Sequence, residues 1–240
     1  MENYTWNTIN GYKADALAEI VRKESKNFSN KMLQTVSYSL DKEAIELISN
    51  DSMKRFCILS EKMASELDSI IDEYNPLENT SLLTSWIILG SLTETALQIF
   101  LAFYISDYKD SQWKQWTNFK KEEVNNKIYS SIKELIDKKI IDNEQGKSLK
   151  NAIKNTIKKH CTEHPVQRIM LDELIQFYKE QELFDNDEIK LLRKIQSNRN
   201  GIHSFENRTL DGFEEIILAV KFWCYLLEWI LLRLPDIPDY

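Results

Sequence analysis

The chain is poor in the two residues that most often interrupt regular structure, since its 240 residues include only five glycines and four prolines. Turns are therefore expected to be few, and the regular elements long. We find no Gly-rich phosphate loop, no internal repeat and no alternating strand pattern in the sequence. Valine is also scarce, whereas leucine, isoleucine, lysine and glutamate are abundant, and this balance favours helix over sheet.

Cysteine is scarce as well, and Cys57, Cys161 and Cys224 are too few and too scattered for a disulfide framework. Cys57 and Cys224 lie in apolar helical surroundings, where a reduced and buried thiol is expected. Residues 1–6 lack the basic start and apolar run of a secretory signal. These observations together predict a protein of the reducing cytoplasm.

An excess of basic residues is absent, because 31 Lys and Arg face 38 Asp and Glu, for a net charge of -7. This balance argues against a general nucleic-acid coat and leaves room for a local basic surface. The spacing of Lys147, Lys150, Lys154 and Lys158 places these four residues along one helical face. Such a stripe can follow a phosphate backbone, so the four lysines are candidate RNA-binding residues; ordinary solvated lysines are the alternative.

Helical periodicity dominates the chain and predicts an all-α protein of eight or more helices. Asn75-Pro76 breaks the pattern and suggests two parts, an N-terminal helical region of residues 1–75 and a helical bundle of residues 76–240. The main predicted helices are 12–25, 29–49, 51–73, 80–108, 121–141, 143–160, 166–184, 187–198 and 212–233.

The segment 82–105 is apolar enough to raise the question of a membrane span. Glu94 lies near its middle, and a carboxylate at that depth in a bilayer is costly, so a buried core helix and no membrane contact are predicted. A buried carboxylate must be paired or protonated. Arg199, Arg193 and Arg168 are equivalent candidate partners, and the pair would be structural or would support a site.

A short polar stretch between the last two predicted helices holds Arg199 and His203. Arginine is a permanent cation that can grip phosphate through several donors, and histidine can move protons near neutral pH. The two side chains would share a face in a helix, with Ser204 as a supporting polar neighbour. This pattern indicates a candidate site for phosphodiester cleavage; the alternative is a polar helix terminus with His203 on the surface.

The sequence His160-Cys161-Thr162-Glu163-His164 is a weaker candidate, for zinc binding. No second ligand pair lies nearby in the sequence, and Pro165 favours an exposed helix terminus. No metal or other cofactor is therefore predicted.

Three stretches together resemble a group of uncharacterised bacterial proteins of the HEPN superfamily. They are the helix Gly90-Ser91-Leu92-Thr93-Glu94 with its continuation to Tyr108, the signature Arg199-Asn200…His203, and the ending Arg233–Asp239. The resemblance covers roughly residues 76–240. It implies an all-α bundle that commonly forms homodimers, with two Arg…His stretches facing each other across a cleft.

Many members of this superfamily are metal-independent endoribonucleases of toxin–antitoxin, phage-defence or CRISPR-linked systems. The resemblance thus implies RNA as a partner, together with an antitoxin or another defence protein. It assigns proton transfer to His203, phosphate binding to Arg199 and an orienting role to Asn200. Other members are inactive, so a non-catalytic interaction or sensor module is the alternative function.

One feature departs from the HEPN signature, which usually has four to six residues between Arg and His, whereas this chain has three. One residue changes the direction of a helical side chain by about 100°. Either the backbone here is not regular helix or the geometry of the pair is altered. The apolar final helix, with Phe222, Trp223, Trp229 and Ile230, is expected to supply the dimer interface.

Overall fold

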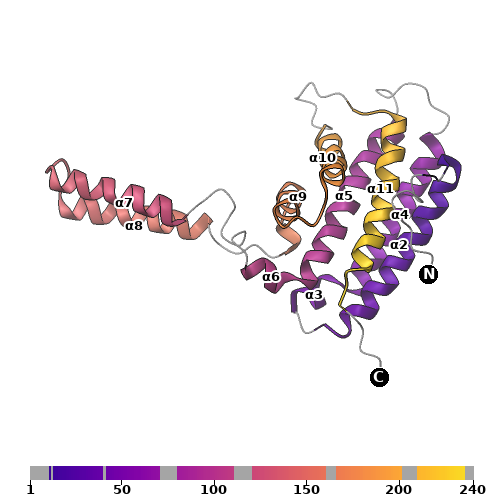
Figure 1. The fold of residues 1–240 in the computed structure, drawn as a ribbon, viewed down its shortest axis with the longest axis horizontal. Coiled ribbons are helices and arrows are strands. Elements are labelled where there is room, and N and C mark those ends of the chain that lie inside the picture. The colour runs from indigo at the N-terminus through magenta and orange to yellow at the C-terminus, as the bar shows by residue number, and fades with distance from the viewer. Residues whose placement is uncertain are drawn as a thin grey trace. The chain divides into compact units, whose positions relative to one another are not determined.

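A computed structural model describes residues 11, 13–39, 42–70, 80–110, 121–160, 166–201 and 210–235. Within these ranges the chain forms ten α-helices and one short 3-10 helix, and it contains no strand. The prediction of an all-α protein with eight or more helices is therefore confirmed (Figure 1).

The contacts divide the chain into two compact units. Unit 1 comprises Met1–Phe103 and Val166–Tyr240, and unit 2 comprises Tyr104–Pro165. Helices from both sides of residue 75 pack together in unit 1, so this division does not fall at the predicted boundary.

The central element of unit 1 is α5 (Thr80–Phe103), which packs against α3, α4, α9, α10 and α11. The sequence predicted one helix over 80–108, but α5 ends at Phe103 and a separate helix, α6 (Ile105–Asp110), follows in unit 2. By length and composition α5 could cross a membrane, with a mean hydropathy of 1.5 over its most apolar window. Because 67% of that window is buried inside the protein, α5 behaves as a core helix.

The helices α2 (Ala14–Val36) and α4 (Asn50–Ile70) pair along their length, and α3 (Lys42–Leu47) lies between them in the chain. The sequence predicted two helices, 12–25 and 29–49, where α2 runs without a break. The reason is that Leu17, Val21, Phe28 and Met32 are fully buried at helical spacing, so one continuous face packs into the core.

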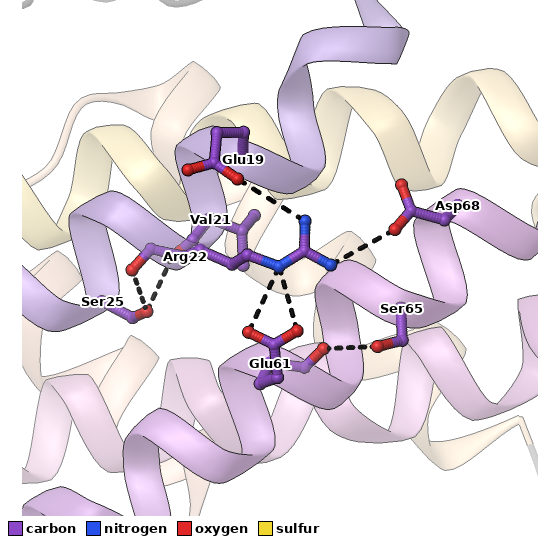
Figure 2. A network of polar contacts seen from close by, with 7 residues as sticks. All are labelled: Glu19, Val21, Arg22, Ser25, Glu61, Ser65 and Asp68. Atoms are coloured by element: carbon purple, nitrogen blue, oxygen red, sulfur yellow. Dashed lines mark hydrogen bonds and ion pairs between the residues drawn. The ribbon is translucent and has the colours of Figure 1, made fainter.

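An ion-pair network joins the outer surfaces of α2 and α4 (Figure 2). Arg22 Nε donates to both carboxylate oxygens of Glu61, at 2.9 and 3.2 Å, and Nη2 donates to Asp68 at 3.2 Å. Glu19 lies 3.8 Å from Nη1 on the same helix as Arg22. Such solvent-accessible pairs each contribute about 0–1 kcal/mol, so the network aligns the two helices more than it stabilises them.

The chain returns to unit 1 through a 3-10 turn, Val166–Arg168, followed by α9 (Leu171–Glu180) and α10 (Asn186–Asn200). The predicted helix 166–184 is interrupted because Met170 adopts an extended conformation and caps α9. Asp185 caps α10, with its Oδ1 accepting the N–H groups of Asp187 and Glu188 at 2.8 Å.

The last helix of unit 1 is α11 (Phe213–Leu231), which packs on α2, α5 and α10. Phe222, Trp223, Trp229 and Ile230 are all buried within the chain. Trp229, for example, packs against Phe100 of α5, with ring centroids 5.2 Å apart. The expectation that these four residues supply a dimer interface is therefore wrong, because helices distant in sequence already cover them.

Unit 2 contains α6 and a helical hairpin formed by α7 (Lys121–Asp137) and α8 (Asn143–His160), which pack along each other (Figure 1). Ile132 of α7 and Gly146 of α8 are buried in this hairpin. A Cβ atom at Gly146 would lie 2.5 Å from Cδ1 of Ile136, so glycine allows the two helices to approach closely.

Candidate functional site

Arg199 lies across the central helix α5. Because α10 extends to Asn200, Arg199 belongs to its last turn rather than to the loop predicted after residue 198. A Cβ atom at Gly90 would lie 2.8 Å from Cβ and Cγ of Arg199 and 2.5 Å from its Cδ. The absence of a side chain at Gly90 therefore provides the space for the aliphatic part of Arg199.

The guanidinium group of Arg199 pairs with Glu94, one helical turn beyond Gly90. Nη2 of Arg199 lies 2.8 Å from Oε2 of Glu94. The other carboxylate oxygen, Oε1, accepts the backbone N–H of Leu171 at 2.8 Å, at the first residue of α9. The N-terminus of α9 and a cation thus both face this carboxylate and hold it in place.

The structure selects Arg199 among the three arginines considered as partners of Glu94. Arg193 instead forms an ion pair with Asp172 and donates to Gln196 at 2.8 Å. Arg168 is exposed in the 3-10 turn before α9. The Glu94–Arg199 pair is partly shielded, with side chains that are 16% and 28% exposed. Within the described part of the chain, Glu94 occupies one of the five N–H donors of this guanidinium.

A second contact ties the end of α10 to the residue that precedes the cap of α11. The Nδ2 group of Asn198 donates to Oδ2 of Asp211 at 2.9 Å, and its Oδ1 accepts the backbone N–H of Asp211 at 2.8 Å. The indole N–H of Trp86, on α5, donates to the backbone carbonyl of Asp211 at 3.1 Å. We call Asn198, Asp211 and Trp86 the Asn198–Asp211 clamp, which joins the end of α10 to Asp211 and Asp211 to α5.

This clamp was not predicted from the sequence, although a signal was present. Ile189, Leu192 and Ile195 are buried at intervals of three residues, and Asn198 continues that series. Asn198 is only 4% exposed. A polar residue at the next position of an apolar face requires a buried hydrogen-bond partner, and this requirement could have drawn attention to it.

Of the other predicted residues in the stretch that contains Arg199, only Asn200 falls among those described. Asn200 is half-buried and is the last residue of α10. Gly201 follows as the cap, with its N–H bonded to the carbonyl of Ser197 at 2.9 Å. His203 and Ser204 lie outside the described residues, so the predicted shared face of Arg199 and His203 stays a prediction.

The four predicted RNA-binding lysines belong to α8 in unit 2, whereas Arg199 belongs to unit 1. Lys147 and Lys154 are exposed, and Lys150 is half-buried. The backbone at Lys158 is helical, and its side chain lies outside the described part.

The zinc candidate gains no support from the part of the chain that the structure describes. No group of three or more His, Cys, Asp or Glu side chains able to hold a metal ion occurs there. His160 ends α8, and residues 161–165 lie outside the described ranges.

Comparisons with family models, with curated proteins and with solved structures found no match for this chain.

Proposed function

We propose that the chain is a metal-independent endoribonuclease of the HEPN type, acting on single-stranded or looped RNA in a phage-defence or toxin–antitoxin setting. The observation that carries this proposal is the contact of Arg199 with Gly90 and Glu94. The resemblance rests partly on the Gly90…Glu94 helix and partly on the Arg199 signature, which are about a hundred residues apart in the sequence. These two stretches meet in the fold, and α5 holds the proposed phosphate-binding cation in place.

In the proposed reaction the RNA 2′-hydroxyl attacks the adjacent phosphorus, and the bond from phosphorus to the 5′-oxygen breaks. The 2′-hydroxyl loses its proton, the leaving 5′-oxygen gains one, and the products are a 2′,3′-cyclic phosphate and a 5′-hydroxyl. His203 transfers protons in this scheme, and Arg199 stabilises the charge that develops on the phosphate. Asn200, next to Arg199 in the chain, orients one of the two groups.

The guanidinium is suited to this role because Gly90 and Glu94 of α5 fix its position. A donor that is already oriented needs no reorganisation when charge develops. Among the described residues, Glu94 takes one N–H group of Arg199, and the proposal assigns other N–H groups to a phosphate oxygen. Ser204 would support His203, and a second copy of the chain would complete the cleft by two-fold symmetry.

The test is incubation of the purified full-length protein with single-stranded RNA in EDTA. The wild type is expected to release fragments that end in a 2′,3′-cyclic phosphate. His203→Ala and Arg199→Ala should each lower the rate by about 10²–10⁴-fold. Arg193→Ala is the matched control, because Arg193 lies on the same helix and pairs with Asp172 instead. An inactive wild type, or equal rates for all four proteins, contradicts the proposal.

The second candidate is a non-catalytic interaction or sensor module that binds a defence-system protein such as an antitoxin. One observation favours it: Glu94 pairs with Arg199 within the fold itself, as in a structural ion pair. In this case Arg199→Ala would lower the stability of the protein and leave RNA intact. An unchanged oligomeric state in all variants, together with no cleavage by any of them, supports this alternative.

A further inference from the structure

The two units of the chain have net charges of opposite sign. Residues 104–165, which form unit 2, contain 13 lysines and no arginine, against nine Asp and Glu. The rest of the chain contains 18 Lys and Arg against 29 Asp and Glu. Unit 2 is therefore basic within an acidic protein, and this division into units was not visible from overall composition.

The basic character is concentrated on α8. Between Gln145 and His160 this helix has five lysines and no carboxylate. Gly146 is buried and Ile153 half-buried, on the side of the helix that packs on α7. Lys147 and Lys154 are both exposed. They share a neighbouring side of the helix because seven residues make nearly two full turns.

The lysines of α8 follow one another along the helix axis rather than forming a compact cluster. Lys147 and Lys158 are eleven residues apart in one helix, which corresponds to about 16 Å of helix axis. Exposed asparagines, Asn151 and Asn155, lie between the lysines. Amide side chains are common ligands of nucleic-acid phosphates and sugars. Lys127 and Lys133 are exposed on α7, and Lys138 and Lys139 are exposed in the turn that follows it, where Lys138 lies 3.8 Å from Glu134.

The residue types favour a nucleic acid over an acidic protein surface. Lysine is a flexible point charge, whereas the planar guanidinium of arginine matches carboxylates and base edges through paired bonds. A hairpin with many lysines and no arginine can attract a phosphate backbone but lacks the arginine fork used most often to read guanine. A linear row of charges also matches a linear polyanion.

We infer that the α7–α8 hairpin is an RNA-binding element that holds the phosphate backbone without reading base sequence. The choice of RNA as the polyanion rests on the proposed function, while the binding itself does not require cleavage. The hairpin would raise the local concentration of RNA for a nuclease site carried by unit 1.

The experiment measures binding of a fluorescent 2′-O-methyl RNA by anisotropy over a series of salt concentrations. This RNA lacks the attacking hydroxyl, so cleavage cannot interfere. Lys147→Glu/Lys154→Glu is expected to weaken binding at least tenfold at low salt and to reduce the slope of log K against log salt by about 1.4, or 0.7 for each lost phosphate contact. Oligonucleotides of scrambled sequence should bind the wild type within about threefold of one another.

The matched control is Lys26→Glu/Lys54→Glu, which makes the same change in net charge at exposed positions of α2 and α4 in unit 1. It should bind like the wild type, and circular dichroism verifies the fold of every variant. Equal loss in both double variants, or clear base preference, overturns the inference. A change in sedimentation of the hairpin variant with unchanged RNA affinity also overturns it and indicates a protein partner.

The two proposals fail in different ways. If the wild type binds the methylated RNA but does not cleave ordinary RNA, the nuclease proposal is wrong and the proposal of an RNA-binding hairpin stands. If the wild type cleaves RNA and the hairpin variant binds RNA normally, the proposed role of the hairpin is wrong and the nuclease proposal stands. If the protein cleaves RNA, the Lys147→Glu/Lys154→Glu substitutions should raise the KM for RNA and leave kcat unchanged.

Discussion

Arg199 lies directly against Gly90, so closely that a single added methyl group on α5 would overlap three carbons of the arginine side chain. Glu94, one turn further along α5, takes the guanidinium at 2.8 Å. Gly90 provides the space and Glu94 provides the opposite charge. The position of the proposed catalytic cation is thus determined by α5, and changes in α5 can displace it without altering the arginine itself.

The first prediction concerns Gly90→Ala. In a helix interior this change usually stabilises a protein by about 0.5–1 kcal/mol. Here the new Cβ would overlap Cβ and Cγ of Arg199 at 2.8 Å, close to the backbone of α10, where the side chain cannot rotate away. We expect a net loss of about 1–3 kcal/mol in urea denaturation.

Gly146→Ala is the control for this prediction, because its nearest contact is the flexible end of Ile136, Cδ1 at 2.5 Å. It should cost less than Gly90→Ala. Combining Gly90→Ala with Arg199→Ala should recover part of the loss, since Cγ and Cδ are removed while Cβ remains. Strictly additive effects of these two substitutions would show that the contact does not determine the cost.

The partner of Glu94 illustrates what the sequence could and could not predict. A carboxylate within an apolar helix requires a cation, and this argument correctly narrowed the choice to three arginines. Choosing Arg199 required the packing of α10 on α5, which no local pattern specifies. The role of Gly90 could not be predicted for the same reason. A glycine in a helix indicates a close contact only once the residue that packs against it is known.

Errors in the predicted elements arose from the same dependence on distant contacts. The division of α2 into two helices ignored the buried face that runs through Phe28. The prediction of a dimer interface on α11 rested on the idea that this helix has more apolar surface than contacts within the chain can cover. The partners of Trp223 and Trp229 include Phe56 and Phe100, which lie on helices more than a hundred residues earlier in the chain.

The second prediction tests the Asn198–Asp211 clamp. Asn198→Asp places two carboxylates where a hydrogen bond of 2.9 Å now joins an amide and a carboxylate. We expect a loss of about 1–3 kcal/mol in unfolding free energy, because two acceptors then face each other, one of them buried. Asn198→Asp/Asp211→Asn exchanges donor and acceptor and should recover much of that loss. An exchange variant no more stable than the single variant would count against the clamp.

The third prediction concerns Glu24 of α2, which is 9% exposed. Burial raises its pKa above the ordinary value of 4.5, against smaller opposing effects of Lys23 and Asn27. A raised pKa in the folded state means that Glu24 supports stability below pH 4.5 and that this support is lost as the pH rises through the folded-state pKa. Glu24→Gln should therefore raise the melting temperature at neutral pH.

That gain should shrink as the pH is lowered, since protonated glutamate and glutamine are both neutral. Melting curves of the wild type and Glu24→Gln at neutral and acidic pH measure it. Glu46→Gln, at an exposed position of α3, is the control and should change the melting temperature little. A gain that is constant with pH would show that it does not come from the charge.

The fourth prediction concerns Tyr225 of α11, whose hydroxyl donates to Oε1 of Glu188 at 2.9 Å. Burial, together with this bond to a carboxylate, raises the pKa of Tyr225 from 10.0 to about 12. Because Glu188 also caps α10, accepting the N–H of Asp185 at 2.8 Å, the bond joins the start of α10 to α11.

Tyr225→Phe should lower the unfolding free energy by about 1 kcal/mol at neutral pH, the usual contribution of one hydrogen bond. The folded-state pKa is raised, so this contribution is fully present below pH 10 and is lost as the pH rises toward about 12. Urea denaturation across this range should show the stabilities of the wild type and Tyr225→Phe converging. A difference that persists above pH 12 would mean that the ring's packing, rather than its protonated hydroxyl, is responsible.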